Sequence, residues 1–429
     1  MQEHGPHDQI WNPSIVNLGS TAFICSPAIG YSEDDGKVSK IYGDELFAKE
    51  ENDCDRVVAK DIDPRNTFTV RSSHGYEPVP PKYVPILHAK LAQVGINVLH
   101  SEKRPSYHHI VYDYAGIDLY DLFVKHENPI RFRYDRLEGL PVAPEEEEDD
   151  RERKEEKKEG EREEREIKAY PFFEDIVPLF IPVFKGLNAM HARGLIHTDI
   201  KPSNLTYDAA RHRVNLIDFG LLTNEYSFLD FIMQEHVCDG TYPFYPPEIM
   251  YLTKMHREEG LLTQKLQEQY TYMDWPSDPW EIIYTLREYY RSMARSFRRR
   301  QRSDTSDTSD TSDTIETSDT LYMSALYAEA RTVHGYDLAV CLDAFALGST
   351  LRHVYEYAKE AKRVADASWC DAHLLPIIRA MCAPRLKDRM MIPEALDAIT
   401  HVLEGHQKKS NRLMDAMMTR IVPKCMRFT

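Results

Sequence analysis

The sequence predicts an α+β fold in which a small β-sheet with one helix is followed by a larger, mainly α-helical part. Between residues 10 and 123, short β-rich runs surround one stretch with the apolar spacing of a helix. From residue 339 to residue 405, apolar residues recur at three- and four-residue intervals, as they do in buried helices. Segments that are too polar to join a core interrupt the chain between these parts.

Four runs in the first part predict strands, and one run predicts a helix. The strand-like runs are NPSIVNLG at 12–19, KVSKIY at 37–42, NTFTV at 66–70 and HHIVYDYAG at 108–116. The helical run covers residues 43–60, where Phe47, Cys54, Val57 and Val58 share a helical spacing. We therefore expect these four apolar side chains to form the buried face of that helix.

The second part contains long apolar segments and two inserts. Residues 172–195 predict a buried helix that leads into a loop, and residues 339–364 predict a pair of helices. Residues 144–168 form a charged low-complexity insert, residues 251–336 form an insert that contains repeated SDT triplets, and residues 406–429 form a tail. We expect the charged insert and the triplets to contribute nothing to the core.

Composition restricts the class of protein. The formal charge of -17 argues against binding to nucleic acid, because such binding depends on Lys and Arg neutralising phosphates. Seven cysteines are scattered without a CxxC pair, which is typical of reduced thiols in an intracellular protein. The N-terminus lacks a secretory signal and no long apolar run occurs, so we expect no membrane association and a cytoplasmic location. Nuclear or virion association stays open.

Two motifs in the middle of the chain carry the chemistry. LIHTDIKPSNL at 195–205 and VNLIDFG at 214–220 supply what phosphoryl transfer needs, namely a base, a cation and metal ligands. Asp199 would accept the proton of an attacking hydroxyl, Lys201 would balance phosphate charge, and Asn204 and Asp218 would hold magnesium. An isolated HxD or DFG is often an ordinary turn. Here HxDxKxxN, DFG, GTYPFYPPE and DAFALG occur together in one order.

On these motifs the chain resembles the eukaryotic-type protein kinase family, over residues 10–405 and most strongly over 188–248. The resemblance implies a bilobal kinase-like fold that uses ATP and Mg²⁺. A small antiparallel sheet with one helix would form an N-lobe at 10–112, followed by a hinge at 113–117 and a helical C-lobe at 118–405. It further implies that Glu248 pairs with Arg389 and that Asp343 begins a buried helix that braces the catalytic loop.

The lysine that would contact the nucleotide phosphates has two candidates. Lys60 ends a VVAK run that resembles the family's strand motif, but it follows a helical stretch and precedes a helix-stop signal. Lys40 lies on the strand-like run KVSKIY, with an acidic helix directly downstream. We therefore assign the role to Lys40. Glu50 is preferred to Glu51 as its ion-pair partner, because the apolar residues of the helix continue the face of Glu50.

The resemblance also implies further nucleotide-binding residues and two departures from the family pattern. Gly19, Phe23, Tyr112, Tyr114 and Asp118 would complete the nucleotide site. The departures are Thr21 and Ile24, which stand where the family has loop glycines, and Thr198, which replaces the arginine before the catalytic aspartate. The first predicts a weaker grip on phosphate, and the second predicts activity that does not depend on phosphorylation of the activation segment.

Several short motifs, among them KVSKIYGDELFAKEEN and YDYAGIDLYDL, are similar to serine/threonine kinases encoded by large cytoplasmic DNA viruses. Lys201 two residues after the base, together with Thr241, resembles serine/threonine rather than tyrosine kinases. The expected partners are protein substrates with Ser or Thr acceptors, and the oligomeric state is not predicted. Two alternatives remain: a pseudokinase scaffold that transfers no phosphate, and a small-molecule phosphotransferase that shares the HxD loop.

Overall fold

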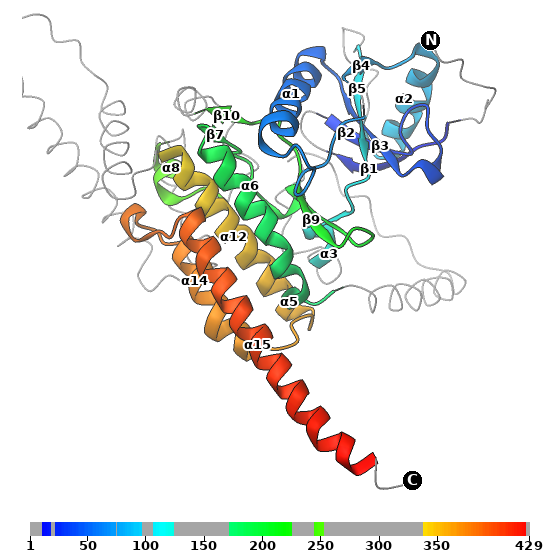
Figure 1. The fold of residues 1–429 in the computed structure, drawn as a ribbon. Helices are drawn as coiled ribbons and strands as arrows, with labels where there is room; N and C mark the ends of the chain where they lie inside the picture. The colour runs from blue at the N-terminus through cyan, green and yellow to red at the C-terminus, as the bar shows by residue number, and fades with distance from the viewer. Residues whose placement is uncertain are drawn as a thin grey trace, which may run out of the picture.

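The computed structural model describes residues 11–18, 22–73, 75–96, 106–123, 171–224, 244–252 and 338–425. The predictions for Gly19, Thr21, the charged insert and the SDT triplets lie outside the described residues. Figure 1 shows a sheet-containing N-terminal region, in blue and cyan, next to a helical region in green, yellow and red.

An antiparallel five-stranded sheet forms the centre of the N-terminal region, in the order β1-β2-β3-β5-β4. Its strands are β1 Ser14–Leu18, β2 Ala22–Ser26, β3 Lys37–Tyr42, β4 Glu77–Pro78 and β5 His108–Asp113. In the register of β3, Lys40 lies opposite Ile24 of β2 and Ile110 of β5. The predicted runs at 12–19, 37–42 and 108–116 thus contain the strands β1, β3 and β5.

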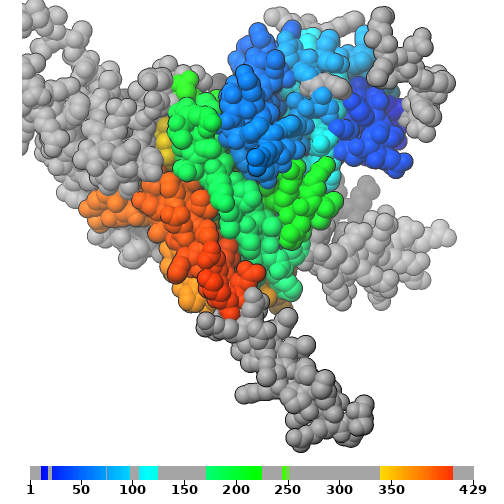
Figure 2. All heavy atoms as spheres, in the orientation of Figure 1, coloured from blue at the N-terminus to red at the C-terminus, as the bar shows by residue number. Residues whose placement is uncertain are grey.

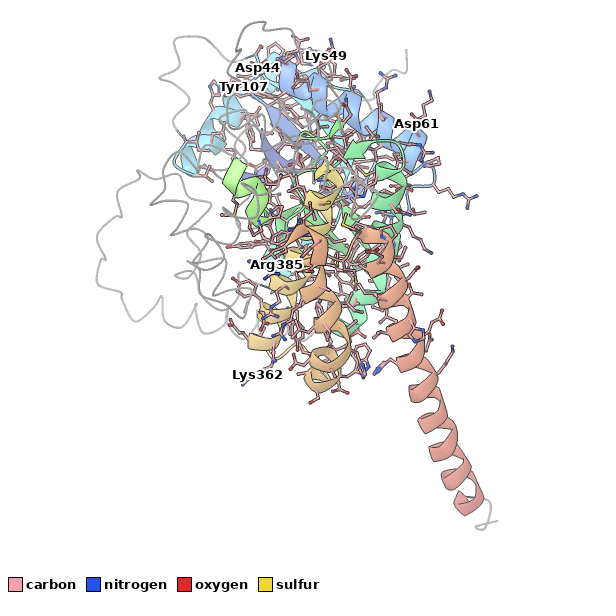
Figure 3. The ribbon with its side chains drawn as sticks, turned by 90° about the vertical axis from the view of Figure 1, so that its left-hand side faces the viewer. Asp44, Lys49, Asp61, Tyr107, Lys362 and Arg385 are labelled. Carbon is pink, nitrogen blue, oxygen red and sulfur yellow. The ribbon has the colours of Figure 1, made fainter. Side chains whose placement is uncertain are left out.

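Helix α1, Glu45–Val57, lies on one face of this sheet and is prolonged by a π-helical turn, Val58–Ile62. Asp44 caps its first turn by accepting a hydrogen bond from the backbone N–H of Leu46 at 2.8 Å. Figure 3 labels Asp44 and Asp61 near the two ends of this helical stretch.

The predicted buried face was right for two of its four residues, since Val58 is buried and Cys54 is partly buried against the core. It was wrong for Phe47 and Val57, which are exposed, whereas the buried residues of α1 are Ala48, Glu51, Asn52 and Asp55. The helix therefore turns a mainly polar face towards the sheet. This is possible because side chains of the sheet provide hydrogen-bond partners for that face.

A second helix, α2 Val84–Gln93, covers the opposite face of the sheet, so the prediction of a single helix in this region was also wrong. Leu87 and Leu91, four residues apart, are both buried, and Leu87 packs with Ile41 and Tyr107. Gly95, with a φ of +83°, follows the helix as a left-handed stop. These signals were present in the sequence, directly after the proline-rich run EPVPP at 77–81.

The run NTFTV at 66–70 is not a strand of the sheet. The carboxylate of Asp63 instead accepts hydrogen bonds from the backbone N–H groups of Thr67, Phe68 and Thr69, at 2.7 to 3.0 Å. The loop holds the two regions together, because Leu216 donates its N–H to the carbonyl of Phe68 at 2.7 Å and the Phe68 ring lies against Gly186. A side chain at Gly186 would clash with that ring. Figure 2 shows the blue N-terminal region resting on the green segment that carries these partners.

The chain passes from one region to the other through Gly116, within the segment 113–117 for which a hinge is predicted. Gly116 has a φ of +97°, and a Cβ atom there would clash with the backbone carbonyl of Tyr207. The chain then enters β6 Ile117–Asp118, which pairs with β8.

The helical region consists of helices and short strands that surround one large apolar core. Its helices are α3 Leu119–Phe123, α5 Phe173–Ile176, α6 Ile181–His191, α8 Pro247–Leu252, α12 Leu338–Glu360, α13 Ala367–Trp369, α14 Leu375–Met381 and α15 Ile392–Cys425. Its further strands are β7 Leu195–Ile196, β8 Leu205–Asp208, β9 Arg213–Leu216 and β10 Thr223–Asn224.

Helix α15 extends away from the body of the molecule in Figure 1 and is continuous across residue 405, where we placed the start of the tail. None of the helices among the described residues is both long enough and apolar enough to span a membrane.

Candidate active site

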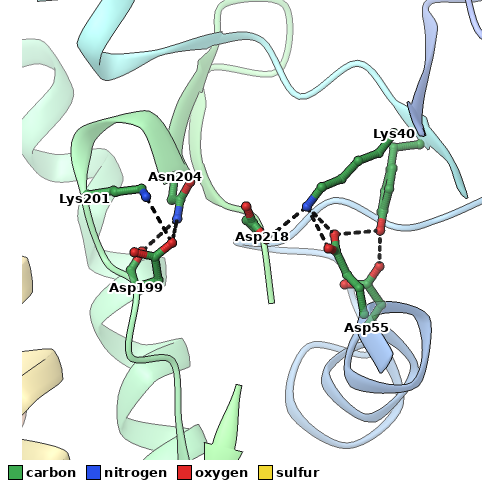
Figure 4. A network of polar contacts seen from close by, with 8 residues as sticks. Lys40, Asp55, Asp199, Lys201, Asn204 and Asp218 are labelled. Atoms are coloured by element: carbon green, nitrogen blue, oxygen red, sulfur yellow. Dashed lines mark hydrogen bonds and ion pairs between the residues drawn. The ribbon is translucent and has the colours of Figure 1, made fainter. Parts of the chain in front are cut away.

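The loop between β7 and β8 brings together the three residues predicted to be catalytic (Figure 4). The Asn204 amide nitrogen donates to both the backbone carbonyl and the side-chain Oδ2 of Asp199, each at 2.8 Å. The Lys201 Nζ atom lies 3.2 Å from the same Oδ2. Asp199 is thus a nearly buried carboxylate whose orientation is fixed by an amide and an ammonium group.

Asp343 fixes the backbone of this loop through hydrogen bonds. Its two carboxylate oxygens accept hydrogen bonds from the backbone N–H groups of His197 and Thr198, both at 2.9 Å, and the His191 Nε2 atom lies 2.9 Å away. Asp343 is completely buried. It lies inside α12 rather than at its start, but its contacts agree with the predicted bracing of the catalytic loop.

Thr198 and Asp218 adopt left-handed backbone conformations, with φ values of +68° and +64°. Such conformations are unfavourable for residues other than glycine, and where they occur they are often found at functional sites. The hydroxyl of Thr198, the residue found in place of an arginine, donates to the carbonyl of Leu221 at 2.7 Å. Thr198 therefore ties the catalytic loop to the segment that follows Asp218.

Lys40 approaches the site from β3 and joins Glu51 of α1 to Asp218. Its ammonium nitrogen lies 2.7 Å from both carboxylate oxygens of Glu51 and 3.0 Å from Oδ1 of Asp218. Figure 4 shows Asp218 between this group and the Asp199 group. The backbone completes the link, because Ile217 donates its N–H to the carbonyl of Asn204 at 3.0 Å.

Burial and charge act in opposite directions on these groups. Burial alone would lower the pKa of Lys40, but the charges of Asp218 and Glu51 outweigh it and raise that pKa. Burial would raise the pKa of Asp218, yet the charge and hydrogen bond of Lys40 hold it below its ordinary value. At neutral pH the contact between Lys40 and Asp218 is therefore an ion pair.

Glu51, not Glu50, is the partner of Lys40, so this prediction was wrong. Glu50 is exposed on α1, whereas Glu51 is 4% exposed and lies against the sheet. The apolar residues of α1 predicted that the face of Glu50 is buried. The buried acids are instead Glu51 and Asp55, because Lys40 and the Tyr112 hydroxyl bind them.

The other residues predicted to bind the nucleotide do not lie together in the structure. Phe23 lies on β2 opposite Ile41. Its side chain is therefore on the other face of the sheet from Lys40, where its ring packs near Tyr107. The Tyr112 hydroxyl points at Glu51 and Asp55. Tyr114 is exposed, and Asp118 accepts a hydrogen bond from the N–H of Asp121. For Tyr114 and Asp118, a role in nucleotide binding stays a prediction.

The donor set suits a magnesium ion that is shared with phosphates. Asp218 and Asn204 offer a carboxylate and an amide oxygen, and the Asn204 nitrogen is already committed to Asp199. No group of three or more His, Cys, Asp or Glu side chains among the described residues could hold a metal ion. Such a set fits Mg²⁺, which is usually bound by one or two protein ligands together with substrate phosphates and water.

Comparison with known proteins agrees with this chemistry. Residues 157–264 match the family model described as the protein kinase domain. Serine/threonine-protein kinase 1 of Orgyia pseudotsugata multicapsid polyhedrosis virus is 43% identical over 64 residues, which are 15% of this chain and 20% of that protein. A human cell division cycle 7-related protein kinase is 37% identical over 49 residues, or 11% of this chain and 8% of that one.

Ribosomal protein S6 kinase beta of Caenorhabditis elegans is 32% identical over 80 residues, or 18% of this chain and 14% of that protein. The matches thus span a small part, between 8% and 20%, of these three relatives. Among solved structures, the Cydia pomonella granulovirus kinase PK-1 aligns over 90% of this chain and 92% of its own, with a TM-score of 0.40 and 12% identity.

Residues 157–264 thus resemble a protein kinase domain in sequence. The chain resembles eukaryotic-type serine/threonine protein kinases, including a kinase encoded by a large DNA virus.

Proposed function

We propose that this protein is a serine/threonine protein kinase that transfers the γ-phosphoryl group of ATP to protein hydroxyls with Mg²⁺. The observation that carries the proposal is the convergence of Lys40, Asp218 and Asp199 at one site: Lys40 lies 3.0 Å from Asp218, and Asp218 lies beside the loop that orients Asp199. When bound, ATP and Mg²⁺ would supply the phosphoryl group and neutralise its charge.

The residues of the chain have separable tasks. Asp199 accepts the proton of the acceptor hydroxyl, because Asn204 and Lys201 orient its carboxylate through the Oδ2 atom. Lys201 places a positive charge beside this carboxylate, where phosphate charge develops. Lys40, fixed by Glu51, places a second positive charge on the other side of Asp218. Asp218 and Asn204 would hold the magnesium ion.

A bilobal kinase fold, with the nucleotide between the sheet and the helical region, is supported by the position of Lys40 and Asp218 on opposite sides of that junction. Protein substrates rather than nucleic acid are supported by the charge of -17. An intracellular location is supported by the described cysteines, none of which forms a disulfide: Cys25, Cys54, Cys341, Cys370 and Cys382.

A transfer assay with radiolabelled ATP, Mg²⁺ and casein or histone as acceptor tests the proposal. We expect label on Ser and Thr, and a loss of about a thousandfold or more in Asp199→Asn, because the amide cannot accept the hydroxyl proton. Asp397→Asn, an exposed residue on α15, is the matched control and should retain full activity. Nucleotide binding without any transfer above the Asp199→Asn level would overturn the proposal and leave a pseudokinase.

A further inference from the structure

A second buried carboxyl group lies directly behind the pair of Lys40 and Glu51. Asp55 follows Glu51 by one helical turn of α1 and is 9% exposed. The hydroxyl of Tyr112, which comes from β5, lies between the two acids, 3.3 Å from Oε1 of Glu51 and in short hydrogen-bond contact with Oδ2 of Asp55. Figure 4 shows this chain of contacts from Lys40 to Asp55.

The charges of this group do not balance if every acid is ionised. Glu51 and Asp55 come from α1 and Asp218 from the loop after β9, which makes three carboxyl groups. Among the described side chains, the one cation in hydrogen-bond contact with them is Lys40, and it contacts Glu51 and Asp218. Because an uncompensated buried charge is strongly unfavourable, one carboxyl group is expected to keep its proton.

Asp55 is the group that keeps it. No contact joins it to Lys40 among the described interactions, and burial, followed by the charge of Glu51, raises the pKa of Asp55 to about 8. Burial also raises the pKa of Tyr112, so the phenol stays protonated. A phenol has a single proton to donate. If Asp55 donates to the phenol oxygen, that proton can be directed to Glu51.

We propose that Asp55 is a positioning residue held as the neutral acid: its O–H donates to Tyr112, whose O–H donates to Glu51 and keeps that carboxylate turned towards Lys40. The assignment of Lys40 to phosphate binding rests on the proposed function. The proton on Asp55 does not, because it follows from burial and charge alone.

The surroundings of Asp55 suggest what happens when the proton is lost. Asp55 also lines a cavity of about 360 Å³ that reaches Phe219, next to Asp218. Three cations from α1, its π-helical turn and the following loop, Arg56, Lys60 and Arg71, border the same cavity. An ionised Asp55 is repelled by Glu51 and attracted towards these cations, so Tyr112 would turn its proton to Asp55 and release Glu51.

The effect on stability has a definite sign. An unfolded Asp loses its proton near pH 4, whereas Asp55 in the folded protein keeps it up to a pKa of about 8. The folded state therefore binds more protons in this window, and the contribution of Asp55 to stability falls as pH rises through it. Asp55→Asn keeps a donor to Tyr112 but has no proton to lose, so the variant should be free of this loss.

The first test is urea unfolding of the full chain from about pH 5 to about pH 9, a range that includes most of the titration window. The stability of Asp55→Asn relative to the wild type should rise steadily with pH, while Asp53→Asn, an exposed neighbour on α1, should run parallel to the wild type. A constant or falling difference for Asp55→Asn would overturn the proposal, since it would mean that Asp55 is ionised throughout.

Two further readouts complete the test. In the wild type, NMR with ¹³C-labelled aspartate should reveal one carboxyl that titrates near pH 8, and its absence would overturn the proposal even if Asp55→Asn failed to fold.

In the transfer assay, kcat/KM of the wild type should fall above that pH, while kcat/KM of Asp55→Asn should stay constant. The kcat/KM of Tyr112→Phe should be about tenfold lower than that of the wild type at neutral pH. If no transfer occurs at all, the proposed function fails, and unfolding and NMR still decide the protonation of Asp55.

Discussion

The catalytic loop and the lysine site are held by different kinds of contact. Asp199, Lys201 and Asn204 lie on one loop, whose backbone N–H groups are fixed by a single buried carboxylate, Asp343. Lys40, by contrast, meets Glu51 and Asp218 through side chains that come from a strand, a helix and a distant loop. The catalytic loop thus carries its geometry in its own backbone, whereas the lysine site depends on the position of α1.

This difference has a consequence for function. A shift of α1 would separate Glu51 from Lys40 and leave Asp199 with its partners, so the two halves of the site can respond independently. Helix α1 is suited to such a shift, because the face it turns to the sheet is largely polar and includes Glu51, Asn52 and Asp55. We therefore expect the lysine side to be the adjustable half of the site.

The largest effect should come from removing the lysine itself. Lys40→Met should lower kcat/KM by about a thousandfold, because it removes the cation next to Asp218 and leaves Glu51 buried without it. Lys60→Met is the matched control, since Lys60 is exposed on the π-helical turn, and it should keep most of the activity. Steady-state kinetics of both variants decide the matter, and the opposite order would reassign the phosphate-binding lysine.

A comparable effect, but on stability, is expected on the catalytic side. Asp343→Ala should lower the free energy of unfolding by about 3 kcal/mol, because it leaves the N–H groups of His197 and Thr198 buried without an acceptor. Asp397→Ala, on the exposed face of α15, should change it by less than about 0.5 kcal/mol. Urea unfolding measures both, and a loss in Asp343→Ala no larger than in the control would show that the loop needs no brace.

The same contrast explains what could be predicted from the sequence. The grouping of Asp199, Lys201, Asn204 and Asp218 could be predicted, because these residues lie close together in the chain and their spacing sets their arrangement locally. Lys40 could also be separated from Lys60, because a strand and a helix end have different signatures.

Glu51 could not be found in this way. The apolar residues Phe47 and Val57 indicated the wrong face of α1, and the burial of Glu51 depends on Lys40 and Tyr112, which belong to other elements. The prediction of a strand at 66–70 was wrong for a related reason. Its β-rich composition was overridden by Asp63, whose carboxylate takes up the backbone donors that a sheet would otherwise use.

A smaller effect should distinguish the two glutamates of α1. Glu51→Gln should lower kcat/KM by about thirtyfold, because the neutral amide holds Lys40 less firmly than the charged carboxylate does. Glu50→Gln, one residue earlier and exposed, should leave kcat/KM unchanged. Equal losses in the two variants would contradict the idea that the lysine side depends on one orientation of α1.

The smallest effect concerns the tether between the two halves. Thr198→Val keeps the shape and the branched Cβ of the side chain, so the strain at a φ of +68° is retained, but it removes the hydrogen bond to the carbonyl of Leu221. We expect a loss of about 1 kcal/mol in urea unfolding, while Thr198→Ser, which keeps the hydroxyl, should stay near the wild type. If both variants lose the same amount, packing of the methyl group rather than the hydrogen bond holds Thr198. A loss in Thr198→Val alone would show that a neutral hydroxyl secures the segment after Asp218 without any phosphate.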